Sequence, residues 1–215
     1  MWKRVAGTAL AGAALYAARR FYRNWGTTKE ECQTPLPGDE LIGQPAVQTT
    51  EGVWIDAPAD AVWPWLIQMG QDRGGLYSYE GVENMVGLSY RDADRIHPEW
   101  QQLSVGDTVR LVPRGWMGLR DGLALPVVQI VPGQSIVLRL QPPAVPWDAV
   151  WSFHVMPRWE DRCRLLVRTR SRMRAPGQVL GAEAAGPVMA LMTRGMLLGI
   201  KRRAERAGGP VSPGS

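Results

Sequence analysis

The sequence is poor in the residues that build cross-linked or metal-centred proteins. Its 215 residues include only two cysteines, Cys32 and Cys163, and two histidines, His97 and His154. Two distant cysteines exclude a disulfide framework and a cysteine-based zinc site, and no His or Cys pair has the spacing of metal ligands. We therefore expect no metal and no cofactor, and we interpret both cysteines as free thiols.

Motifs of nucleophilic catalysis are also missing from the sequence. The G-x-S-x-G motif of serine hydrolases does not occur, and no Cys–His pair of a catalytic motif can be recognised. His97 precedes Pro98 at a predicted turn, and His154 lies in a strand-like run without a visible partner. We interpret each as a structural or exposed imidazole, because a single histidine without a partner is weak evidence of catalysis. The catalytic residues, if there are any, are unknown from the sequence.

A hydrophobic run of full membrane-spanning length is absent. Residues 5–18 carry no charge, and basic residues flank them on both sides. A helix of this length spans roughly 21 Å, against a bilayer core of about 30 Å. We interpret residues 1–26 as a hydrophobic, basic leader that anchors at a membrane surface, with a signal peptide or a plain cytosolic helix as alternatives. If the leader spans the membrane, its heavier basic flank places the rest of the chain on the cytoplasmic side.

Negative charge is concentrated in the middle of the chain and positive charge lies outside it. Residues 27–157 hold eight basic and sixteen acidic side chains, whereas residues 158–174 hold seven basic and two acidic ones. This distribution favours an anionic membrane surface as a partner over nucleic acid, since no aromatic residues interleave with the basic ones. A solvated basic face is the alternative, and we expect this face to lie outside. It consists of Arg164, Arg168, Arg170 and Arg172.

Length and proline content define the domain organisation. A chain of this size buries one full hydrophobic core, and we expect one domain, residues 47–207. Residues 27–46 contain three prolines and are predicted to form an extended linker without helix or strand. The last residues, 208–215, are rich in Gly and Pro and are predicted to be a flexible tail.

The periodicity of apolar residues predicts an α+β domain. Short connections between the strand-like runs indicate antiparallel pairing. Three helices are expected, at residues 58–69, 79–86 and 178–206, the last interrupted or restarted at Gly186–Pro187. The predicted strands are residues 47–55, 108–112, 124–131, 135–140, 149–156 and 163–173.

Several motifs in this order resemble one protein superfamily over roughly residues 24–206. They are WIDAPADAVWPWLIQMG, GGLYSYEGVENMVGL, ADRIHPEWQQLSVGD, WSFHVMP and RLLVRTRSR. Together they resemble a bacterial subgroup of the SRPBCC, or START-like, superfamily of polyketide cyclase/dehydrase and lipid-transport proteins. The resemblance implies a helix-grip fold, in which a curved antiparallel sheet wraps around a long C-terminal helix. Two short helices follow the first strand, and a hydrophobic cavity lies between sheet and helix.

Residues of the C-terminal helix are the first candidates for the wall of such a cavity. Met189, Met192 and Met196 recur at helical spacing and form one stripe of flexible, polarisable side chains. A closely packed core would give the same periodicity, so it remains the alternative. Trp65 and Met69, Tyr77 and Tyr79, and Trp151 and Phe153 complete the candidate ligand-binding residues.

Three functions are compatible with these patterns. Binding or transport of a hydrophobic small molecule, such as a lipid, polyketide or isoprenoid-like compound, is favoured because no paired polar groups are visible for catalysis. A cyclase/dehydrase-type enzyme acting on a hydrophobic substrate is the first alternative. A protein-interaction module that uses the surface of the sheet is the second.

Overall fold

The computed structural model describes residues 19, 21–85, 87–142 and 145–208. The expectations for the leader at residues 1–18 and for the tail at residues 209–215 lie outside these residues. Within the described ranges no helix is both long enough and apolar enough to cross a membrane.

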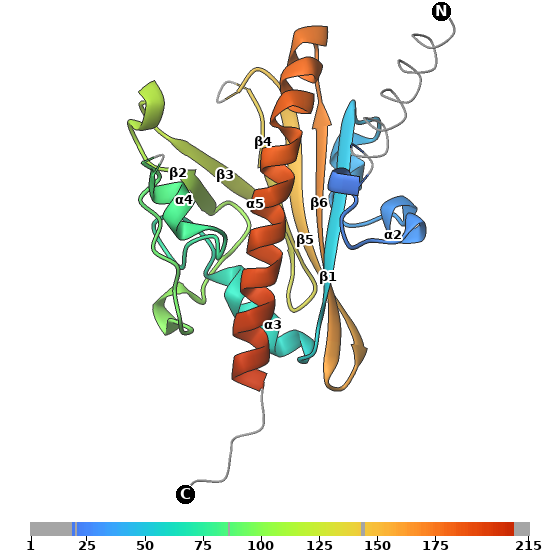
Figure 1. Cartoon of the computed structure of the whole chain (residues 1–215), viewed down its shortest axis with the longest axis vertical. Helices are drawn as coiled ribbons and strands as arrows, with labels where there is room; N and C mark the ends of the chain where they lie inside the picture. The colour runs from blue at the N-terminus through green and yellow to red at the C-terminus, as the bar shows by residue number, and fades with distance from the viewer. Residues whose placement is uncertain (1–18, 20, 86, 143–144, 209–215) are drawn as a thin grey trace, which may run out of the picture.

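A six-stranded antiparallel sheet forms the centre of the molecule, with strand order β1-β6-β5-β4-β3-β2 (Figure 1). Three predicted strands agree with the observed bounds and the other three differ by one to three residues at their ends, so the strand predictions are confirmed. The strands are β1 (Val47–Ile55), β2 (Thr108–Val112), β3 (Leu123–Val131), β4 (Ser135–Leu140), β5 (Asp148–Trp159) and β6 (Arg162–Arg172).

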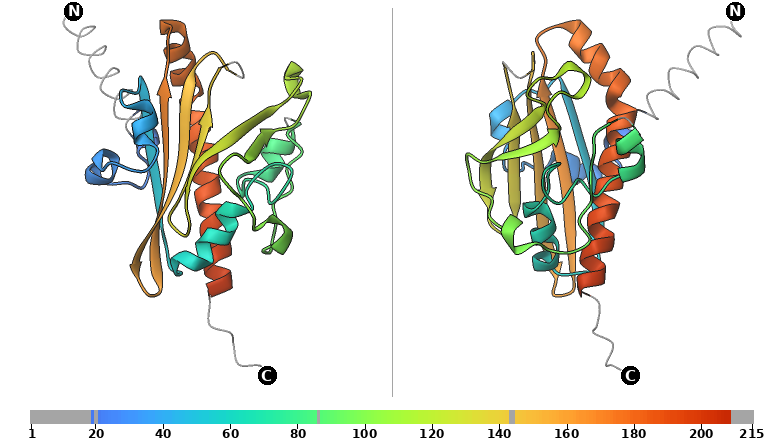
Figure 2. Two further views of the ribbon diagram at one scale, coloured as in Figure 1. Left: turned by 180° about the vertical axis from the view of Figure 1, so that it is seen from behind. Right: turned by 90° about the vertical axis from the view of Figure 1, so that its left-hand side faces the viewer.

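Helix α5 (Pro176–Gly208) runs along one face of the sheet, which we call the inner face (Figures 1 and 2). Its C-terminal half closes the core, where Met196, Leu197, Ile200 and Ala204 are fully buried. Its N-terminal half is different, because Leu180, Val188, Met189 and Leu191 are exposed.

The expected interruption of this helix at Gly186–Pro187 is wrong. Proline removes one backbone donor and crowds the preceding turn, but the helix continues through Pro187. Tyr22 lies against this part of α5: the Tyr22 ring packs at Gly186, and Glu183 pairs with Arg19 and Arg23. These contacts support the helix where its own backbone hydrogen bonding is weakest.

Two short helices follow β1, and the first of them packs against α5. They are α3 (Ala59–Ile67) and α4 (Glu80–Met85), as predicted, and Pro64 lies inside α3. The loop between them holds Tyr77 at a φ of 60°, fixed by a hydrogen bond from its N–H to Asp92 (2.8 Å). A side chain at Gly199 would collide with the Tyr77 carbonyl, so glycine is needed for α5 to pass this close.

The smaller elements complete the chain. Helix α2 (Lys29–Gln33) and the 3₁₀ helix η1 (Asp39–Ile42) precede β1, and η2 (Pro98–Trp100) and η3 (Trp116–Gly118) flank β2. The prediction that residues 27–46 form an extended linker without helix is therefore wrong. Thr28 and Glu31 form a capping box that starts α2, which is a helix signal that the nearby prolines obscured.

Residues 27–42 cover the opposite, outer face of the sheet and bury its arginines. Arg164 binds both carboxylate oxygens of Glu31, at 2.7 and 2.9 Å. Arg168 pairs with Asp39 at 2.6 Å and donates to the carbonyls of Glu31 and Thr34. Both arginines are only 1% exposed.

The expectation that these arginines form a solvated face is therefore wrong as well. Arg170 also pairs with Asp39 (3.0 Å), and only Arg172, at the end of β6, is exposed. A buried guanidinium must find partners for its donors, and the chain preceding β1 supplies them. These arginines hold one part of the chain to another, so they are not free to form a basic membrane surface.

Replacing Arg168 with Met should therefore lower the free energy of unfolding by about 3 to 5 kcal/mol, because it leaves two carbonyls without their donor and Asp39 with one arginine partner in place of two. Arg172→Met removes the same charge from an exposed position and should cost less than about 0.5 kcal/mol. Urea denaturation measures both values. Similar small losses in the two variants would contradict the structural role of Arg168.

Candidate ligand-binding site on the inner face

The register of the sheet places side chains of four strands in rows across the inner face. In one row Glu51 pairs with Val167, Val167 with Phe153, and Phe153 with Ile136. Directly opposed residues of antiparallel strands point to the same face, so Glu51 is a carboxyl in an otherwise apolar row.

The inner face is closed at one end and accessible at the other. Below the Glu51 row, the next row of Val53, Leu165 and Val155 is buried under the C-terminal half of α5. Above it, Thr49, Thr169 and Trp151 form a row that is only half-buried. This second row lies near the end of β6, from which the chain turns into the N-terminal half of α5.

Glu51 lies at the boundary between these two ends. The residue is 3% exposed, and its Oε2 atom has no hydrogen-bond partner among the described residues. Burial raises the pKa of Glu51 to about 8, and a hydrogen bond with the Thr193 side chain opposes this shift only in part. The carboxyl is therefore protonated near neutral pH and can donate a hydrogen bond as well as accept one.

Thr193 connects this carboxyl to the methionine stripe. The Thr193 hydroxyl donates to the carbonyl oxygen of Met189 at 3.0 Å, so its oxygen is left to accept from protonated Glu51. Met192, on the same part of α5, is half-buried. Protonated Glu51 thus contacts α5 at Thr193 and lies next to the half-buried row of Thr49, Thr169 and Trp151.

The other residues proposed from the sequence are distributed over different environments. Trp65, Met69 and Tyr77 are at most 3% exposed and belong to the packed core, and the Tyr77 hydroxyl donates to the Trp65 carbonyl. Phe153 and Met196 are also fully buried, whereas Trp151 is half-buried against Phe153 with ring centroids 4.6 Å apart. Tyr79 and Met189 are exposed, at 37% and 62%.

Two positions that the sequence did not single out are therefore central, Glu51 and Thr193. A signal for Glu51 existed, because it shares one face of its strand with Val53 and Ile55, where a lone carboxyl is unusual. No comparable signal existed for Thr193, because a single threonine in an apolar helix is common.

The two histidines lie away from this site. His97 contacts Glu99 and stacks near Trp100 with ring centroids 4.2 Å apart. His154 is buried on the outer face beside Ser152, and burial lowers its pKa to about 4. In the part of the chain that is described, no group of three or more His, Cys, Asp or Glu side chains could hold a metal ion.

No protein-family model and no curated protein matches this chain. Among solved structures it is similar to a Thermobifida fusca protein solved by NMR, with a TM-score of 0.50 and 16% identity over 74% of this chain and 93% of that one. This similarity, together with the strand order and α5, confirms the predicted helix-grip α+β fold.

Two enzymes of known structure are less similar to this chain. The Zhui aromatase/cyclase from Streptomyces sp. R1128 has a TM-score of 0.44 and 16% identity over 74% of this chain and 94% of that one. Norcoclaurine synthase from Thalictrum flavum has a TM-score of 0.44 and 14% identity over 79% of this chain and 92% of that one. Similarities of this size assign no activity to this chain.

The raised pKa of Glu51 predicts how stability depends on pH. Between its ordinary pKa of 4.5 and its folded pKa of about 8, the unfolded chain loses this proton while the native protein keeps it. The carboxyl therefore lowers the free energy of unfolding by about 1.4 kcal/mol per pH unit across this window.

Glu51→Gln should abolish this loss and make the protein roughly 3 kcal/mol more stable than the parent at neutral pH, with no difference in acid. Denaturant titrations across this pH window measure the difference, with exposed Glu160→Gln as the control. A stability difference that does not change with pH would contradict the buried, protonated state of Glu51.

Proposed function

We propose that this protein binds a hydrophobic small molecule between the inner face of its sheet and the N-terminal half of α5. The observation that carries the proposal is Glu51, a buried carboxyl with an unpaired oxygen beside a partly open apolar surface. A ligand with an apolar body and one hydroxyl or carbonyl would fill the surface and satisfy this oxygen. Lipids, polyketides and isoprenoid-like compounds all have this chemistry.

Exposed apolar side chains near this end of the molecule support exchange of such a ligand with a membrane. Leu180, Val188 and Leu191 project from the N-terminal half of α5, and Phe21 precedes α2; each is more than half exposed. Clustered exposed hydrophobic side chains of this kind are typical of contact sites. The uncharged residues 5–18 precede Phe21 in the sequence.

A second candidate function, an enzyme of the cyclase/dehydrase kind, is favoured by the same carboxyl. A general acid needs a pKa near the working pH, and the pKa of Glu51, about 8, meets this requirement. Native mass spectrometry of the parent and of Glu51→Gln, each purified with its ligand, separates the two functions. A ligand that only the parent converts identifies an enzyme, whereas the same ligand in both variants identifies a carrier.

Met192 provides a test of the binding surface. Met192→Trp should fill the space that a ligand occupies and weaken binding of a fluorescent fatty acid, with little change in the free energy of unfolding. Met196→Trp enlarges a side chain that is 2% exposed in the core, so it should cost about 1 to 3 kcal/mol.

Met85→Trp, at a position 87% exposed, controls for added aromatic surface and should change neither property. Unaltered lipid binding by Met192→Trp, or no lipid binding by the parent protein, would refute the proposed site.

A further inference from the structure

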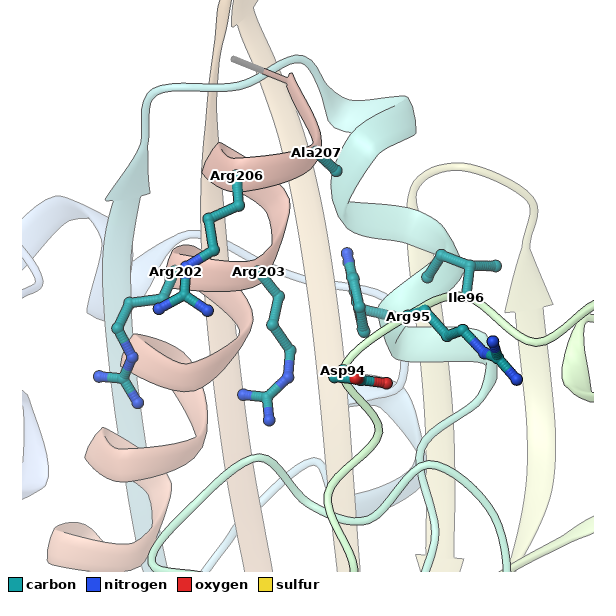
Figure 3. Close-up of a pocket in the computed structure, with 8 residues that line it drawn as sticks. Asp94, Arg95, Ile96, Arg202, Arg203, Arg206 and Ala207 are labelled. Atoms are coloured by element: carbon teal, nitrogen blue, oxygen red, sulfur yellow. The ribbon is translucent and has the colours of Figure 1, made fainter.

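A cleft of about 560 Å³ lies at the opposite end of the molecule from the accessible part of the inner face (Figure 3). It opens between the C-terminal end of α5 and the loop at residues 94–96, with α3 behind it. The residues that line it are Trp65, Asp94, Arg95, Ile96, Arg202, Arg203, Arg206 and Ala207. Met189 and Arg206 are separated by roughly 25 Å along the helix axis, so this cleft is distinct from the proposed ligand site.

The lining of the cleft is strongly positive. Its four arginines and one aspartate carry a net charge of +3, and Asp92, outside the lining, lies 3.6 Å from Arg203. Among the described residues, the side chains of Arg202 and Arg206 have no ion pair or hydrogen bond, although they lie one helical turn apart. Like charges at this spacing repel each other and lower helix stability unless an anion lies between them.

Arg203 differs from its neighbours because it is fixed in place. It donates to the carbonyls of Ala93 (2.8 Å) and Gly199 (3.3 Å), and its guanidinium lies 4.8 Å from the centre of the Tyr77 ring. Figure 3 shows Arg203 and Asp94 on two sides of the cleft, whereas Arg95 points away from it. A rigid cation on the floor of a cleft lowers the entropic cost of holding an anion there.

Trp65 gives an independent indication of a ligand. This residue is 3% exposed and lines the cleft, yet its Nε1–H has no partner among the described residues. An indole nitrogen is a donor only, so a group that satisfies it must be an acceptor. An anionic group with several acceptor oxygens would pair with these arginines and satisfy this donor.

We propose that this cleft binds a phosphate group, held by Arg202, Arg203 and Arg206 and by the Trp65 Nε1–H. Phosphate carries up to two negative charges and several acceptor oxygens, and it matches guanidinium donors better than a single carboxylate does. Ile96 and Ala207 leave an apolar flank for the organic part of a phosphate ester. The exposed apolar side chains of α5 lie at the other end of the helix, which favours a soluble phosphate ester over a lipid headgroup.

Calorimetric titration with inorganic phosphate and glycerol 3-phosphate, at constant ionic strength, tests the site. Arg202→Gln/Arg206→Gln should weaken binding about tenfold or more, since it removes two charge-assisted donors. Arg114→Gln/Arg120→Gln removes the same charge from exposed positions outside the cleft and should keep parental affinity. Asp94→Asn removes the only carboxylate of the lining and should strengthen binding.

The Trp65 indole resonance, assigned by its loss in Trp65→Phe, should shift during phosphate titration of the parent and hardly move with acetate. Phosphatidylcholine vesicles with and without phosphatidic acid separate the two sources of phosphate. Vesicle binding that needs both arginines identifies a headgroup, and soluble phosphate binding alone identifies a free ester. The proposal is overturned if phosphate fails to bind saturably, or if both double variants lose affinity equally.

Discussion

The organisation of the molecule depends on the buried arginines of β6 and the carboxylates that neutralise them. Arg164 and Arg168 point to the outer face, where Glu31 and Asp39 reach them from a segment about 130 residues earlier in the chain. A buried ion pair adds little net stability compared with apolar residues, but a guanidinium left without partners would be very costly. The arginines therefore require residues 27–42 to cover the outer face, and α5 and any ligand are left with the inner face.

Helix α5 divides the inner face into two regions with different roles. Its C-terminal half is covered by α3 and the closed end of the sheet, and Met196, Leu197 and Ile200 are buried there. Its N-terminal half leaves Trp151 and Met192 partly accessible and brings Thr193 to Glu51. One helix thus has a rigid, buried half and a half with an adaptable apolar surface. A hydrophobic ligand would bind to the adaptable surface.

Strand positions could be predicted from the sequence because alternation and turn residues are local signals, as at Pro132–Gly133 between β3 and β4. The environment of the arginines could not be predicted from the sequence, because alternating Arg and apolar residues fit a solvated face and a covered face equally well. The covering acids, Glu31 and Asp39, are local neighbours of prolines that suggested a linker. Burial of Glu51 likewise depends on a helix about 140 residues away, and no periodicity within β1 reports it.

The central claim is that the N-terminal half of α5 and the inner face enclose a ligand. Methyl NMR of the protein labelled at its methionine methyl groups, titrated with a fatty acid, tests it most directly because the methionines sample both halves of α5. The account predicts a saturable shift of the Met192 methyl resonance, with the buried Met196 less affected and the distant, exposed Met85 unchanged. Saturable binding that leaves Met192 unshifted, or shifts confined to Met85, would contradict it.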